Sequence, residues 1–402
     1  MPFNILATRS GNSAYMTSFA AALRAAGCRV DLVCFWSLRG RRPFLRFPKG
    51  HLAPYSNLHF RSCLRLGDWI VSLNPLDWRH WLIRSGNRPR HGKDRLSRLG
   101  PRERKWLLRQ VRRNDPDLVV ANYYTGADLF AALGGPEGTA ILSHDIFADR
   151  NASARALERP ELAFPEAEKA EMDAFRKAGL VITIKDEDGA TLRRRLPGLR
   201  TVTYPMTLPP VSAAPKTERP PICVYVGSGH AANIDGLDWL LDEIWPQVLA
   251  ARPDARLRVV GKMAELRDGP WPARAEAAGF VESLASEYAA TGVALAPIRL
   301  GSGVKIKTVE ALAHGLPVVS TPHAAEGIAP APRQVLRVAA TAEAFADAVV
   351  EALADPDPAA SSRAAGEFAR HRFGFEEAGL PAIHDILAAA RAPGEARTER
   401  DA

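Results

Sequence analysis

The 402-residue chain has only four cysteines, none in a Cys-x-x-Cys pair or at metal-ligand spacing with histidine. This scarcity argues against a disulfide scaffold and a structural zinc site, and it favours a reducing compartment. The sequence also lacks an apolar run near the roughly 18 residues that a spanning helix needs, and its N-terminus lacks a secretion-signal pattern. We therefore expect a soluble, cytoplasmic protein whose contact with a membrane, if it has one, is peripheral on the inner face.

Acidic residues are scarce in one segment, residues 39–113, which holds 20 Lys or Arg but only 4 Asp or Glu. Since the whole chain has a net charge of +8, this segment carries +16 and the rest carries −8. Its arginines are interleaved with large apolar side chains, namely Phe44, Leu45, Phe47, Trp69, Trp78, Trp81 and Trp106. Such a mixture suits an anionic membrane surface or an anionic acceptor. The alternative is a solvated helical face with aromatics in the core; a nucleic-acid partner is not expected.

Strand patterns alternate with helical patterns along both halves of the chain, which predicts parallel sheets built from βαβ units. Strands are expected at 3–8, 29–35, 116–124, 138–147 and 179–188, and a helix at 11–27. A proline-rich stretch at 204–221 predicts a linker. The alternation then restarts with strands at 222–229, 256–261, 293–298 and 316–321 and a helix at 236–252. We expect two doubly wound domains, 1–205 and 206–380, followed at 381–402 by a helix and a disordered tail.

The stretch LGSGVKIKTVEALAHGLPVVST, residues 300–321, reads as a strand end, a glycine turn and a helix that closes at Gly315. Ligands of open parallel sheets bind at this edge, where free N–H groups and the helix dipole favour a phosphate. Glu310 is expected about two turns into the helix, roughly 10 Å from its start. There it could accept hydrogen bonds from both hydroxyls of a ribose. Alternatively, Glu310 only pairs with Lys307 or His314 along the helix.

This stretch closely resembles the donor-site signature of the GT-B glycosyltransferases of family 4, and the resemblance covers most of residues 225–328. It implies that Glu310 binds the nucleotide ribose. A second Glu that relatives carry eight residues earlier is replaced here by Ser302, which leaves the sugar contact and the donor's identity open. The Arg and Lys that relatives use to grip the diphosphate are absent from VGSGHAANIDG, so Lys262, Lys305 and Lys307 are the available cations.

The resemblance is weaker in the N-terminal half, where SHDIF matches the segment that places a histidine, here His144, against the donor. That histidine could instead be a buried core residue. Three residues are catalytic candidates. The resemblance implies a role for His144. Lys307 could stabilise the negative charge that grows on the leaving diphosphate, and Asp145 is a candidate base should the enzyme invert. The resemblance implies donor binding by eight positions: Gly11, Lys262, Val281, Ser302, Gly303, Val304, Lys305 and Glu310.

The implied fold is α/β, with two Rossmann-like domains facing across a cleft, and the implied activity is hexosyl transfer with retention. The donor would be a nucleotide-diphosphate sugar and the acceptor a glycan or lipid-linked glycan, in cell-surface polysaccharide or glycolipid synthesis. The resemblance implies neither a metal nor a further cofactor. Two alternatives remain at this point: a nucleotide-sugar epimerase on the same scaffold, and a non-catalytic, membrane-associated partner protein.

Overall fold

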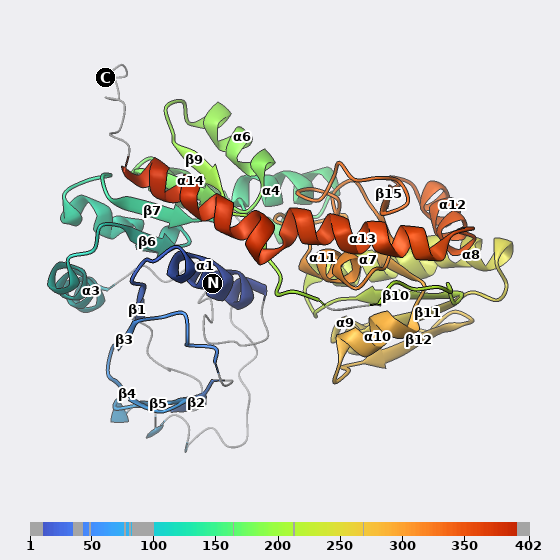
Figure 1. Ribbon diagram of the computed structural model, residues 1–402, viewed down its shortest axis with the longest axis horizontal. Coiled ribbons are helices and arrows are strands. Elements are labelled where there is room, and N and C mark those ends of the chain that lie inside the picture. Colours follow the sequence, from blue (N-terminus) through green and yellow to red (C-terminus); the bar gives the residue numbers. More distant parts are fainter. Residues whose placement is uncertain are drawn as a thin grey trace.

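The computed structural model describes residues 11–34, 43–47, 50–75, 78–79, 82, 100–163, 165–211, 214–267 and 269–391. The strand expected at 3–8 and the tail beyond Arg391 lie outside these ranges. Two α/β bodies stand side by side, the N-terminal one at the left and the C-terminal one at the right of Figure 1. Between residues 204 and 221 the described part of the chain forms no helix and only one isolated β-bridge.

The N-terminal body is organised by a parallel sheet in the order β6-β7-β8-β9. Its strands are β6 (Val119–Asn122), β7 (Thr139–Leu142), β8 (Leu180–Thr183) and β9 (Thr201–Thr203). Every residue of β7 and β8 is buried, as expected for short, fully apolar runs in a parallel sheet. The helical segments of this part are α1 (Gly11–Ala25), α3 (Pro101–Asn114), η1 (Tyr124–Leu133), α4 (Phe147–Ala156), η2 (Pro160–Leu162), α5 (Pro165–Phe175) and α6 (Asp186–Arg195).

Two smaller strand pairings lie beside this sheet. β1 (Asp31–Cys34) pairs in parallel with β3 (Asn57–Phe60). β2 (Phe44–Arg46), β5 (Trp69–Ser72) and β4 (Cys63–Leu66) form an antiparallel three-stranded sheet that sequence reasoning did not predict. In Figure 1 this antiparallel sheet lies at the lower left, away from the C-terminal body.

The C-terminal body has a six-stranded parallel sheet in the order β12-β11-β10-β13-β14-β15. Its strands are β10 (Ile222–Val226), β11 (Arg256–Val260), β12 (Ala275–Gly279), β13 (Val293–Ala296), β14 (Val318–Ser320) and β15 (Leu336–Val338). Its helices are α7 (Ala231–Trp239), η3 (Leu240–Ile244), α8 (Trp245–Ala251), α9 (Met263–Leu266), α10 (Leu284–Ala290), α11 (Ile306–Ala313) and α12 (Ala342–Leu353).

The helix expected at 236–252 differs in detail, because it begins five residues earlier and contains the π-helical turn η3. Pro246 follows at the start of α8. Proline has no N–H and its ring clashes with the preceding turn, so the regular hydrogen-bond ladder is interrupted there.

The end of the chain connects the two bodies. α13 (Pro358–Phe373), the π-helical turn η4 (Phe375–Gly379) and α14 (Leu380–Arg391) run as one band from the C-terminal onto the N-terminal body (Figure 1). α13 packs on α11, whereas α14 packs on α1, β8 and β9. Where the band crosses, Leu208 N–H donates to Phe373 O at 2.9 Å and Leu208 bridges Gly374. The chain therefore passes twice between the bodies, at adjacent points.

Candidate active site

The strand order of the C-terminal sheet places a crevice at the carboxyl ends of β10 and β13. From β10 the chain builds outward through β11 and β12 on one side, and from β13 through β14 and β15 on the other. The loops after β10 and β13 therefore diverge, and it is at such a reversal of strand order that open parallel sheets bind their ligands. On the β11 side, Gly261 has φ +104°, and a Cβ there would lie 2.2 Å from Gly227 O. Only glycine allows these two loops to approach so closely.

The loop after β13 meets the N-terminal body directly. Gly303 has φ +75°, and a Cβ at this position would lie 2.8 Å from His144 O, in the loop after β7. Ser153 Oγ of α4 donates to Gly301 O at 3.2 Å and lies 3.3 Å from Gly301 N. The carboxyl edges of the two sheets thus face each other, and the positions expected to bind donor lie opposite the SHDIF segment.

Helix α11 begins at Ile306, so Glu310 lies about one turn, or roughly 6 Å, from the helix start instead of the expected two turns. Its Oε2 accepts a hydrogen bond from Lys307 Nζ at 2.6 Å. Both side chains remain partly exposed, at 45% for Lys307 and 25% for Glu310. His314 Nδ1 lies 2.9 Å from Glu310 O. The Glu310 carboxylate therefore has a partner on its own helix and still reaches solvent.

His144 lies in the interface, with only 5% of its surface exposed. Its ring stacks on Tyr123, with centroids 4.3 Å apart, and Nε2 lies 2.6 Å from Asn122 Oδ1. Because this amide oxygen can only accept, Nε2 carries the proton and Nδ1 is left as an acceptor. Nδ1 is buried without a hydrogen-bond partner among the described residues. Burial lowers the pKa of His144 to about 3, so the ring is neutral at physiological pH.

Asp145 and Lys305 face one another across the same interface. Burial raises the pKa of Asp145, against the opposing influence of Arg150, the Ser302 hydroxyl and Lys305. Lys305 is half-buried, and its Nζ donates to Gly303 O at 2.9 Å. Burial lowers the pKa of Lys305 to about 8, against the attraction of Glu326 and Asp145. An ammonium next to the start of α11 can neutralise an anion held there.

A buried ion cluster that sequence reasoning missed links the two bodies below this point. Lys185, which precedes α6 and is 3% exposed, forms ion pairs with Asp188 at 3.2 Å and with Glu326 of the C-terminal body. His323 Nδ1 lies 3.2 Å from Glu326 Oε1. Burial alone would raise the pKa of Glu326, but His323 and Lys185 lower it to about 2. Burial raises the pKa of Asp188 to about 7.

The remaining expected donor positions lie around the crevice. Gly11 begins α1, exposed Lys262 follows β11, and half-buried Val281 follows β12 by two residues. Val304 is buried, and its Cγ2 would lie 2.7 Å from a Cβ on Gly327. Their roles in donor binding stay predictions.

One feature of the sequence could have pointed to two of the missed residues, whereas a third, Arg150, had no such signal. In VITIKDED, a lysine and three acids directly follow a buried strand, so Lys185 and Asp188 fall at the ligand-binding edge. Arg150, in α4, lies close enough to Asp145 and His230 to lower the pKa of each. Only the folded structure shows that Arg150 faces the C-terminal body.

No helix in the described ranges combines the length and apolar character that crossing a bilayer requires. Across those ranges, no three His, Cys, Asp or Glu side chains gather as a metal site would require.

His144→Phe tests the role of the buried ring nitrogens, because phenylalanine keeps a flat ring for stacking on Tyr123. If Nδ1 accepts a hydrogen bond from a hydroxyl of the bound donor sugar, kcat/KM should fall by about 2- to 12-fold. This factor is the equivalent of one neutral hydrogen bond. The wild-type pH profile should show no limb near pH 6.5, since His144 stays neutral. Asn122→Ala is the matched control for a loss of stability, because it removes the hydrogen-bond partner of the other ring nitrogen, Nε2, and leaves Nδ1 in place. A His144→Phe enzyme with lower melting temperature but unchanged kcat/KM would make this a core histidine.

Comparisons with known proteins agree with this geometry. Residues 220–355 match the family described as glycosyl transferases group 1. The matched range contains all six strands of the C-terminal sheet and the α11 helix. A search of curated proteins finds no match.

Similar solved structures cover both bodies. Sucrose-phosphate synthase from Thermosynechococcus elongatus is 19% identical, with a TM-score of 0.65, covering 95% of this chain and 94% of that one. A UDP-forming α,α-trehalose-phosphate synthase from Burkholderia xenovorans is 14% identical, with a TM-score of 0.53 and coverages of 75% and 81%. Anabaena HepE in complex with UDP-glucose is 15% identical, with a TM-score of 0.53 and coverages of 71% and 82%. These likenesses confirm the predicted fold of two Rossmann-like domains, the GT-B arrangement.

Proposed function

We propose that the chain is a GT-B glycosyltransferase of group 1 that moves a hexose from a UDP-sugar to a glycan or lipid-linked acceptor. The family is supported by the match over residues 220–355 and by the fold of the similar structures. The choice of UDP is supported by two similar structures, one described as UDP-forming and one holding UDP-glucose. The proposed setting is the synthesis of a cell-surface polysaccharide or glycolipid. The proposed location is the cytoplasm, at the inner face of the membrane.

One observation supports this proposal most strongly, namely the direct apposition of the Gly301–Lys305 loop and the His144–Asp145 loop. It brings a helix start, an ammonium, a carboxyl and an unpartnered ring nitrogen together between two sheet edges. In our proposal the UDP diphosphate lies at the start of α11, and Glu310 binds the ribose from the first turn. The transferred sugar then lies toward the N-terminal body, where His144 Nδ1 accepts from one of its hydroxyls.

The proposed reaction breaks the bond between the anomeric carbon and the diphosphate oxygen, and the electron pair stays on that oxygen. An acceptor hydroxyl forms the new bond from the same face, and its proton passes to the departing diphosphate, so configuration is retained. Negative charge on the diphosphate grows along this path. The Lys305 ammonium and the α11 N–H groups therefore stabilise the transition state more than the ground state. Lys307 would contribute if it leaves Glu310 when UDP binds. Asp145 is the base to test should the product prove inverted.

A donor panel tests the proposal. The purified protein is incubated with UDP-, GDP- and ADP-hexoses, and nucleotide release and the anomeric configuration of the product are followed. We expect UDP release from a UDP-hexose, stimulated by acceptor. Release from another nucleotide sugar only would overturn the choice of UDP, and interconversion of sugars without transfer would favour an epimerase.

Glu310→Gln tests the donor site separately, because it keeps the size of the side chain and removes its charge. If Glu310 binds both ribose hydroxyls, the change weakens charge-assisted hydrogen bonds worth roughly 1.5 to 3 kcal/mol. The Kd of UDP, measured by calorimetry, should then rise by about 10- to 150-fold. Glu343→Gln, in the exposed first turn of α12, is the matched control and should leave the Kd unchanged.

The pairing with Lys307 gives the competing interpretation of Glu310. An exposed pair three residues apart on a helix is worth only about 0.2 to 0.5 kcal/mol. If pairing is the only role of Glu310, then Glu310→Gln and Lys307→Met should both lower stability by this small amount and leave UDP affinity intact. That outcome would remove Glu310 from the donor site.

A further inference from the structure

Exposed apolar side chains are concentrated in one small part of the molecule. Of the eight large hydrophobic residues that are strongly exposed in the described ranges, five lie between positions 64 and 82. These five are Leu64, Leu66, Trp69, Leu73 and Leu82. The other three, Leu266, Phe280 and Val338, belong to the C-terminal body. Large apolar clusters on a protein surface mark sites of contact with another protein or with a membrane.

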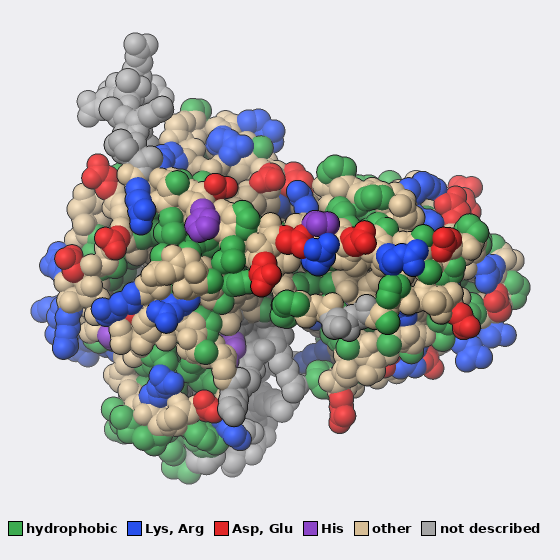
Figure 2. Space-filling model, viewed as in Figure 1, with side chains coloured by type: hydrophobic (Ala, Val, Ile, Leu, Met, Phe, Trp, Pro, Cys, Tyr) green, Lys and Arg blue, Asp and Glu red, His purple; other side chains and the backbone are tan. Residues whose placement is uncertain are grey.

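The pleat of the antiparallel sheet explains the cluster. Leu64 is paired with Val71, and Leu66 with Trp69, so these four side chains share one face. The opposite face carries Ile70, which is 1% exposed and packs in a local core with Phe47 and Leu52. One face is thus buried, while the other presents leucines and a tryptophan outward. Figure 2 shows this apolar surface at the lower left, beneath the N-terminal body.

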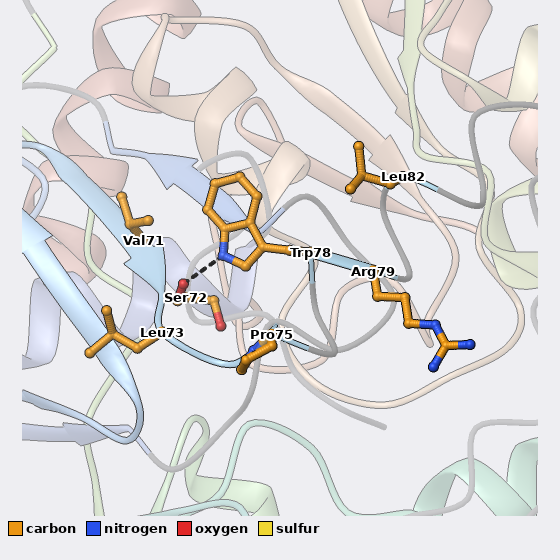
Figure 3. Close-up of a pocket in the computed structure, with 7 residues that line it drawn as sticks. All are labelled: Val71, Ser72, Leu73, Pro75, Trp78, Arg79 and Leu82. Atoms are coloured by element: carbon orange, nitrogen blue, oxygen red, sulfur yellow. Dashed lines mark hydrogen bonds between the residues drawn. The ribbon is translucent and has the colours of Figure 1, made fainter.

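An apolar groove continues the outer face beyond the end of β5. It is lined by Val71, Ser72, Leu73, Pro75, Trp78, Arg79 and Leu82 (Figure 3). Trp78 Nε1 donates to Ser72 O at 2.8 Å, which fixes the indole against the strand. In Figure 3, Leu73 and Leu82 extend from opposite sides of the groove, and Arg79 points away from Trp78. The groove therefore offers apolar walls with a guanidinium at its edge.

Positive charge accompanies this surface. The described residues from 43 to 82 include four arginines and one acid, Asp68. Arg46 is paired with Trp69 on the outer face, and its guanidinium lies 5.8 Å from the centre of the Trp69 ring. Arg79 is exposed at the edge of the apolar groove. Arg65 is paired with Ile70 on the opposite face and donates to Gly67 O at 3.0 Å, so it does not belong to this surface. Leucine and tryptophan side chains that enter the boundary of a bilayer, with arginines at the level of its phosphates, are the combination that holds a protein on an anionic lipid surface.

The helical part of the basic segment behaves differently. In α3, Arg104 donates to Asp128 O at 2.7 Å and Arg112 to Ala132 O at 3.1 Å, both in or near η1. Leu107 of the same helix is buried. These two arginines bind the protein's own backbone, whereas Arg102, Lys105, Arg109 and Arg113 of the same helix are exposed. Within the described basic segment, the strongly exposed large apolar side chains all lie at positions 64–82, so a lipid surface that needs both apolar and basic side chains is assigned to that region.

We propose that the outer face of the β2–β5–β4 sheet is a docking surface for the anionic headgroup boundary of a lipid bilayer. Leu64, Leu66 and Trp69 enter the boundary, and Arg46 and Arg79 contact lipid phosphates. This surface lies on the N-terminal body, so docking would hold that body at the membrane while the C-terminal body stays in solution. The proposal does not depend on the reaction. Its test uses neither donor nor acceptor, so its failure would leave the transferase proposal intact.

The test measures flotation of the full-length protein with two kinds of vesicle. One contains phosphatidylcholine alone, and the other also contains about 40% of the anionic lipid phosphatidylglycerol. We expect binding to the anionic vesicles that weakens as salt rises, because screening shortens the reach of the arginine charges. Replacing Leu64, Leu66 and Trp69 together by serine should lower the partition coefficient more than about tenfold. The matched control is the triple serine variant of Leu266, Phe280 and Val338, which should bind as the wild type does.

A second pair of variants separates charge from apolar contact. Arg46→Gln with Arg79→Gln should weaken binding to anionic vesicles by about 25-fold, since each cation near the surface contributes about fivefold. Arg363→Gln with Arg372→Gln, two exposed positions on α13, is the control of equal charge. All variants are first compared by melting temperature, and only those within a few degrees of the wild type are used.

Three results would overturn the proposal. The first is equal binding to neutral and anionic vesicles. The second is equal loss of binding in the outer-face and control triple variants. The third is a dimer in solution that the outer-face variant dissociates, because the apolar face would then be covered by a second copy of the chain.

Discussion

The Lys305→Met enzyme should lose about two to three orders of magnitude in kcat, the usual effect of removing one preorganised group that meets developing negative charge. Lys305 Nζ lies beside the start of α11, between Gly303 O and the acidic groups Asp145 and Glu326. The leaving diphosphate is proposed to take its place among these groups. Methionine keeps about the length and the apolar stem of lysine, so a fall in kcat measures the contribution of the Lys305 ammonium.

The pH profile gives Lys305 a signature of its own. Because burial lowers its pKa to about 8, the ammonium is present below that pH and is lost as the pH rises through it. In the free enzyme, kcat/KM should therefore fall above about pH 8. Lys305→Arg should move this falling limb to higher pH, because guanidinium stays charged. If Lys305→Met has wild-type kcat and an unchanged profile, the α11 N–H groups alone hold the diphosphate.

Lys185→Met should cost about 3 to 5 kcal/mol in the free energy of unfolding, because it leaves the buried Asp188 carboxylate without its cation. Lys185 is 3% exposed and is bound by Asp188 and Glu326, which belong to different bodies. The matched control is Lys177→Met, which breaks an ion pair with Asp128 in which both side chains are 51% exposed. Exposed pairs are worth about 0 to 1 kcal/mol, so the control should unfold close to the wild type.

The loss in Lys185→Met should also depend on pH. Asp188 already has a pKa raised to about 7 by burial, and removing its cation raises it further. Protonation below that value neutralises the buried carboxyl, so the stability gap between variant and wild type should narrow as the pH falls from 8 to 6. Chemical denaturation at several pH values measures the gap. A gap below 1 kcal/mol at pH 8 would show that water reaches the cluster.

Much of the fold could be predicted from the sequence, because short apolar runs such as TAIL and LVIT are buried on both faces and can hardly be anything but inner strands. The antiparallel sheet was missed, although β4 and β5 are separated only by Gly67 and Asp68, a two-residue pair typical of a hairpin turn. The strands are three or four residues long, too short for the alternation of leucine and arginine to stand out. In this sheet, only the pairing of β2 with β5 joins strands that are distant in the sequence.

The candidate site was predictable to the level of its loops, and less so for its side chains. The resemblance located the 300–321 stretch, but helical spacing cannot orient Lys305, because this residue precedes the helix and turns inward to Gly303 O. Helical spacing does place Lys307 three residues before Glu310 on the same face, and the structure contains that predicted pair. Arg150 and Lys185 act across the interface, and a single sequence contains no signal for contacts between domains.

The position of α14 determines how this protein can be divided. Tyr15 and Phe19 of α1 pack with Tyr204 near the first crossing, and α14 completes the same side of the N-terminal body. Arg200 also donates to Ala389 O of α14. A fragment cut at the proline-rich linker therefore lacks a helix that the chain supplies only at its far end. Separate expression of the N-terminal body would require residues 380–391 to be fused to it, and the C-terminal fragment could then end at Gly374.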